Sequence, residues 1–156
     1  MNTYPILYNF TERIPGDGFW ASVRVFGRAL AVQEDDQEWW AYGVNPGAIA
    51  GGGASIRAAF ADLQYHFRQY LADVAASATT EDAFKRELER FHNECDPETL
   101  AEWDAAVQAI RTGQKAPPPG MTLQPLNQSA SGIYVEIIKR PTPSAAHVDE
   151  AVAIAA

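Results

Sequence analysis

The sequence predicts an α+β fold: a small antiparallel sheet covered by one long helix, with an added helical hairpin and a later strand that rejoins the sheet. Three patterns support this prediction. The first 45 residues contain apolar runs separated by turn residues, residues 56–74 repeat apolar side chains every three or four positions, and residues 132–139 are rich in β-branched side chains. We therefore expect a single domain over residues 1–140, followed by a C-terminal tail over residues 141–156.

Turn chemistry delimits the first strands. The segment Ile14-Pro15-Gly16-Asp17-Gly18 favours a tight turn, because Pro fixes φ while Gly tolerates positive φ. From Phe19 onward, apolar residues at every second position up to Val25 indicate a half-buried strand. Beyond Gly27 the apolar residues Leu30 and Val32 fall on the opposite parity, which predicts a bulge at Gly27-Arg28 that swaps the faces of this strand. The acidic segment 34–38 predicts a solvated hairpin loop, and residues 39–44 form the returning strand.

Helix caps and apolar periodicity predict three helices. Ser55 is placed to cap a long helix at residues 55–76 that covers the sheet. Its apolar stripe comprises Ile56, Phe60, Leu63, Phe67, Tyr70, Leu71 and Val74. Residues 79–113 predict a helical hairpin, with Thr79 or Thr80 capping its first helix and Asp96-Pro97 beginning its second. The proline-rich spacer 116–120 cannot be helical, and it leads to a strand at 132–140.

Composition limits the class of protein. Hydrophobic residues make up 47% of the 156 residues, which is enough for a core. The 12 Lys and Arg against 20 Asp and Glu give a net charge of −8, which opposes nonspecific binding of nucleic acid. The single cysteine, Cys95, excludes an internal disulfide, and no apolar run is long enough for a membrane helix. We expect a cytoplasmic protein whose partner is another protein, such as a small basic one, rather than nucleic acid or a membrane.

Two short segments indicate a family resemblance. Residues 40–47, W-A-Y-G-V-N-P-G, form an aromatic-rich strand that ends in a proline-glycine turn, and Gly53-Ala54-Ser55 places a glycine before a helix cap. Together with the long helix, residues 18–75 resemble the HicB-like antitoxin family. The resemblance implies a degenerate ribonuclease H-type sheet with a covering helix, and a function in neutralising a toxin. The DNA-binding motif that family members often carry at the C-terminus is not readable in residues 141–156, which contain no Lys or Arg.

The sequence predicts no catalytic, cofactor-binding or metal-binding set. A two-metal nuclease needs several convergent carboxylates, whereas Asp62 and Asp73 point away from the apolar stripe of their helix. His92 and Cys95 would supply two ligands, fewer than a metal site needs. The Gly-Gly-Gly run at 51–53 lacks the lysine of a phosphate-binding loop and favours a flexible turn.

The candidate interface combines acidic, aromatic and apolar side chains. Its members are Asp35, Asp36, Glu38, Trp39, Trp40, Val148, Val152 and Ile154. The two tryptophans alternate on the strand, so one lies in the core, and the other is either covered by the tail or an exposed anchor. We expect a homodimer, with the tail bridging subunits or covering the exposed tryptophan.

Two classes of function remain open. The leading hypothesis is a non-enzymatic interaction module, similar to an antitoxin that neutralises a basic toxin or ribonuclease through complementary charge. The alternative is an enzyme or small-ligand binder that uses a pocket between the sheet and the helical hairpin.

Overall fold

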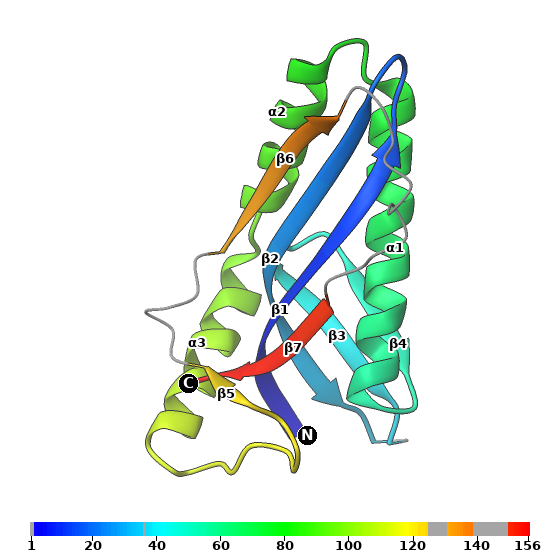
Figure 1. The fold of residues 1–156 in the computed structure, drawn as a ribbon. Helices are drawn as coiled ribbons and strands as arrows, with labels where there is room; N and C mark the ends of the chain where they lie inside the picture. Colours follow the sequence, from blue (N-terminus) through cyan, green and yellow to red (C-terminus); the bar gives the residue numbers. More distant parts are fainter. Residues whose placement is uncertain (1, 36, 125–130, 139–149) are drawn as a thin grey trace.

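The structure, a computed structural model, describes residues 2–35, 37–124, 131–138 and 150–156. Within these residues it has three helices and a seven-stranded sheet, which confirms the α+β class (Figure 1). The strands are β1 (Asn2–Pro15), β2 (Trp20–Gln33), β3 (Trp39–Asn45), β4 (Ala50–Gly53), β5 (Leu123–Gln124), β6 (Gly132–Ile138) and β7 (Glu150–Ala155). The helices are α1 (Ile56–Ser77), α2 (Glu81–Asn93) and α3 (Pro97–Arg111).

The sheet is built around the long hairpin of β1 and β2. Its strand order is β4-β3-β2-β1-β7-β5, and every pair of neighbours is antiparallel except β5 and β7. β2 is long enough to pair twice on one edge, with β6 through residues 20–26 and with β3 through residues 28–33. The strand predicted at 132–140 therefore rejoins the sheet as expected. The sheet as a whole is mixed, because β5 runs parallel to β7.

Both faces of β2 are buried along its second half. Ala29 and Ala31 face the core beneath α1, while Leu30 and Val32 belong to a second apolar cluster on the opposite face. The predicted swap of faces at Gly27 is therefore wrong: β2 pairs with β1 without a break, and the register shift lies in its pairing with β3. Consecutive positions of β2 are apolar here because helices cover both faces of the sheet.

The predicted helix starts are confirmed by their caps. The Ser55 hydroxyl accepts a hydrogen bond from the Ala58 amide at 3.0 Å, and the Thr80 hydroxyl accepts one from the Ala83 amide at 3.0 Å. The Asp96 carboxylate accepts one from the Thr99 amide, also at 3.0 Å, just before Pro97 begins α3. These side chains satisfy amides that have no partner within the helix, which fixes where each helix begins.

The two helices expected in residues 79–113 form as α2 and α3, and their largest buried side chains belong to different apolar clusters. α2 places Phe84 and Leu88 in the same cluster as α1, whereas α3 places Trp103 and Val107 against the second cluster. In Figure 1 the two helices follow one another along one side of the molecule, and α1 lies along the other. Each helix thus buries its apolar stripe against a different part of the sheet.

The glycine run at 51–53 is part of strand β4, so the predicted flexible turn is wrong. A Cβ atom on Gly51 would lie 2.3 Å from the Leu63 amide nitrogen and 2.5 Å from the Ala59 carbonyl oxygen. Glycine here lets the backbone of α1 approach the strand closely. The Gly52 amide donates a hydrogen bond to the Asp62 carboxylate at 3.0 Å, which gives that acid a structural role.

The described part of the expected tail is a strand of the sheet. β7 pairs with residues 6–10 of β1, and Ile154 is fully buried in the core beneath α1. The domain therefore includes residues 150–155 and does not end at residue 140. The tail packs on its own chain because its alternating Val152 and Ile154 suit a strand against β1 better than an isolated helix.

Candidate functional site

A groove of about 540 Å³ lies between the sheet and α3. Its floor includes Leu30 and Val32 of β2, and its walls carry Glu34 just after β2, Tyr42 of β3 and Glu102 of α3. We call it the acidic groove. It is also lined by Gly43, Gly47, Ala48, Ile49, Ala50 and Thr99. Glu34 and Glu102 are 68 positions apart in the chain, and the packing of α3 on the second face brings them to one groove.

The groove has an aromatic wall. Tyr42 is 36% exposed, and its hydroxyl donates a hydrogen bond to the Glu34 carboxylate at 3.1 Å. Partial burial and the neighbouring Glu34 carboxylate raise the pKa of Tyr42, so the phenol stays protonated as a donor at neutral pH. The Trp40 ring stacks on the Tyr42 ring with 6.1 Å between centroids and 15° between planes. Two π faces therefore lie beside a carboxylate, an arrangement that attracts cations.

The charge of the groove is negative. Neither Glu34 nor Glu102 forms an ion pair with any residue that the structure describes, and no Lys or Arg is among the described residues that line the groove. Asp35 and Glu38 are exposed on the hairpin that carries Glu34. The local field thus favours a positively charged group from a partner.

Trp39 and Trp40 are consecutive residues of β3, and their side chains lie on opposite faces of the sheet as expected. Trp39 is half-buried against the core beneath α1, with its ring centroid 6.0 Å from that of Tyr4. Trp40 is half-buried beside the acidic groove. The described part of the tail, β7, pairs with β1 and β5 and not with β3, the strand that carries both tryptophans.

The remaining predicted interface residues divide into three groups. Asp35 and Glu38 lie exposed near the groove, whereas Ile154 is inaccessible and Val152 half-buried in β7. Asp36 and Val148 lie outside the described residues. The sequence did not single out Tyr42 or Glu102. Tyr42 could have been predicted from the alternation of a strand, which places it on the same face as Trp40. No sequence signal could have predicted Glu102, because its place in the groove depends on long-range packing.

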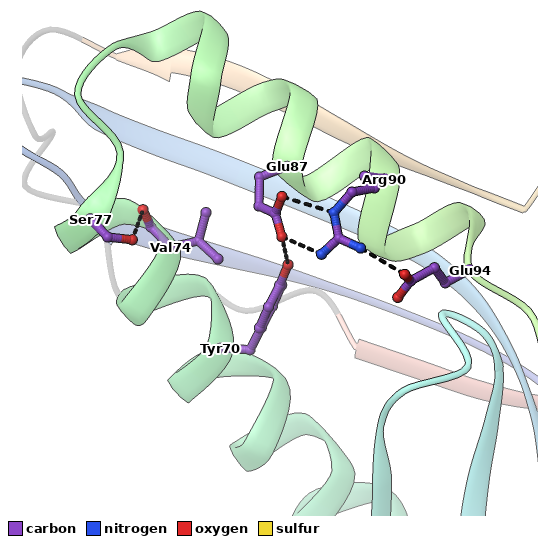
Figure 2. Close-up of polar contacts among 6 residues, drawn as sticks. All are labelled: Tyr70, Val74, Ser77, Glu87, Arg90 and Glu94. Atoms are coloured by element: carbon purple, nitrogen blue, oxygen red, sulfur yellow. Dashed lines mark hydrogen bonds and ion pairs between the residues drawn. The ribbon is translucent and has the colours of Figure 1, made fainter.

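Two helix arginines, Arg68 and Arg90, are paired with acids. Figure 2 shows Arg90 between Glu87 and Glu94, with 2.7 Å from its Nη1 to the Glu94 carboxylate, and Tyr70 of α1 donating to Glu87 at 3.2 Å. Arg68 pairs with the buried Glu12 at 2.9 Å. These contacts tie helices to each other and to the sheet, and they give the helices a surface of mixed charge.

Titratable groups outside the groove do not assemble a recognisable metal site. Among the described residues, no group of three or more His, Cys, Asp or Glu side chains is placed to hold a metal ion. Cys95 is half-buried and its thiol donates to the Asp96 carbonyl at 3.7 Å. His92 is buried, and burial together with the nearby Arg28 charge lowers its pKa, so the imidazole is neutral at pH 7.

Comparisons with protein-family models, curated proteins and solved structures give no match to this chain. None of the described helices is long and apolar enough to cross a membrane. The functional argument therefore depends on the geometry of the chain itself.

Proposed function

We propose that this protein is a non-enzymatic, cytoplasmic interaction module that binds a basic partner protein, as an antitoxin binds and neutralises a basic toxin or ribonuclease. The acidic groove is the observation that carries the proposal. It presents two carboxylates without described ion-pair partners beside two stacked aromatic rings, on a chain of net charge −8. The resemblance of residues 18–75 to HicB-like antitoxins supports the same function.

The chemistry of the groove selects a cationic side chain. A Lys or Arg of the partner would lie against the Tyr42 ring, with its charge between Glu34 and Glu102. Cation–π contact contributes about 0.5–2 kcal/mol, depending on how far the pair is desolvated. The surrounding acids would steer a basic partner toward this face and mask its positive surface.

Binding can be tested with a defined probe. We expect a 12-residue peptide of alternating Arg and Gly to shift the NMR signals of the Trp40 indole and of residues 34, 42 and 102 in the labelled protein. The double variant Glu34→Gln/Glu102→Gln should weaken binding about tenfold, because it removes both carboxylates while conserving shape. The matched control Glu81→Gln/Glu89→Gln removes the same charge from exposed positions of α2 and should change affinity less than twofold.

Three outcomes would contradict the proposal. They are no binding of the basic peptide, equal weakening by both double variants, and equal binding of an acidic peptide of the same length. Equal weakening would mean that net charge alone attracts the peptide.

We also propose that two copies associate through β6. This strand pairs with β2 on one edge, and none of the described strands pairs with its other edge. Its seven residues contain neither Pro nor Lys, the residues that commonly block pairing at a sheet edge, and Tyr134 on it is 54% exposed. Antiparallel pairing of two β6 strands would give closed two-fold symmetry.

Light scattering measures the association directly. Between 5 and 50 μM we expect a mass near twice the 17.1 kDa of one chain, and amide exchange in residues 133–137 that slows as concentration rises. The amides of β4, at a different edge, serve as the control and should exchange at the same rate throughout. A mass of one chain at every concentration would refute the dimer.

A further inference from the structure

A second hollow, of about 300 Å³, lies on the sheet face opposite α1 and shares no lining residue with the acidic groove. We call it the Arg28 cavity. Leu7 of β1, Phe26 of β2 and Ala153 of β7 supply apolar walls, and Ser131 and Tyr134 add hydroxyl groups at one side. Arg28 is the charged residue among the described lining residues. The cavity therefore combines one positive charge with an apolar interior.

The Arg28 guanidinium is held in place without a carboxylate. Its Nη2 donates to the Asn45 side-chain oxygen, and its central carbon lies 5.1 Å from the centroid of the Trp103 ring. It forms no ion pair with any residue in the described part of the chain. The Nε of Arg28 is buried and has no hydrogen-bond partner among the described residues. Because buried charges are ordinarily paired, this oriented guanidinium points to an anion from outside the chain.

The neighbouring histidine does not supply the missing negative charge. His92 is buried, with its Nε2 2.9 Å from the Ser131 hydroxyl, and its Nδ1 has no hydrogen-bond partner among the described residues. Since the imidazole is neutral at pH 7, the described lining of the cavity carries the single positive charge of Arg28. One monovalent anion would balance it.

We propose that the Arg28 cavity binds a small organic acid, with its carboxylate on the guanidinium of Arg28 and its apolar body against Phe26, Leu7 and Ala153. An arginine has five N–H donors, and the hydrogen bond to Asn45 uses only Nη2, which leaves Nη1 to donate to a carboxylate. The volume accommodates a single six-membered ring. This site is independent of the acidic groove, which attracts the opposite charge.

The test uses benzoate, benzamide and phenyl phosphate as probes of the full chain by NMR titration. We expect benzoate to bind and to shift the signals of residues 7, 26 and 153. Benzamide, which has the same shape without the charge, should bind at least tenfold more weakly. Tighter binding of phenyl phosphate than of benzoate would overturn the assignment to a carboxylate, and equal binding of benzamide would show that Arg28 selects no anion.

Three variants locate the site. Arg28→Gln should weaken benzoate binding at least tenfold. Because Arg28 also contacts Trp103 and Asn45, Ala153→Phe provides a second test that fills the cavity and leaves the charge in place, and it too should weaken benzoate binding at least tenfold. Arg57→Gln removes a positive charge from an exposed position of α1, on the other face of the sheet from the cavity, and should change the affinity less than twofold.

Variants of one site test its binding proposal without affecting the other site. Ala153→Phe should leave binding of the basic peptide to the acidic groove unchanged, and Glu34→Gln/Glu102→Gln should leave benzoate binding unchanged. Benzoate binding that survives Ala153→Phe in the folded variant would show that the ligand lies elsewhere.

Discussion

Replacing Phe67 with alanine should lower the free energy of unfolding by about 3–5 kcal/mol, the range for truncating a fully buried aromatic side chain. Phe67 lies on the sheet-facing side of α1 and has no exposed surface. Its ring packs edge-on against Phe10 of β1 at 5.1 Å and Phe91 of α2 at 5.7 Å between centroids. The substitution would leave a cavity where helix α1, helix α2 and the sheet meet. Urea denaturation monitored by circular dichroism measures the loss.

Tyr65→Ala is the matched control on the same helix. Tyr65 is 53% exposed, two residues from Phe67, and its removal should change the free energy of unfolding by no more than about 0.5 kcal/mol. A loss under about 1 kcal/mol for Phe67→Ala would contradict the packing of the apolar stripe on the sheet.

Local signals predicted the helices well. Ser55 and Asp96 each stand one residue before a helix in the structure, and both accept the amide hydrogen bond expected of a cap. A capping side chain binds amides in the first turn of the helix that follows it, so a few consecutive residues are enough to predict the cap. The strand at 132–138 was likewise predictable from its β-branched residues.

Local sequence patterns did not predict which face of the sheet each helix covers. Leu30 and Val32 face α3 while Ala29 and Ala31 face α1, and one apolar run therefore serves two clusters. A strand with one buried face and a bulge would show this run of apolar residues, and so would a regular strand with both faces buried. The sequence alone does not distinguish the two. The position of α3 on the second face decides between them, and that position depends on contacts far apart in the chain.

The same limit applies to both candidate sites. The acidic hairpin and Trp40 were predicted as interface residues, and they lie beside the acidic groove. Glu102 and Arg28 were not predicted, because each acquires its role from distant residues: Glu102 from the docking of α3, and Arg28 from its contacts with Trp103 and Asn45.

Ile154→Ala should lower the free energy of unfolding by about 2–5 kcal/mol, as expected for a buried isoleucine. Ile154 has no exposed surface, lies opposite Ile6 in the pairing of β7 with β1, and donates its amide to the Thr122 carbonyl at 2.9 Å. β7 is thus held by its own chain. The difference in stability between Ile154→Ala and the parent should therefore be the same at 1 and 50 μM protein, even if both form dimers through β6.

Val152→Ala is the control in the same strand. Val152 is half-buried, so its truncation should cost about 1 kcal/mol or less, by denaturant titration under the same conditions. A loss for Ile154→Ala that grows or shrinks with protein concentration would show instead that this residue is buried between subunits, because only stability linked to association depends on concentration. The tail would then bridge two copies, and β7 would belong to the interface rather than to the core of one chain.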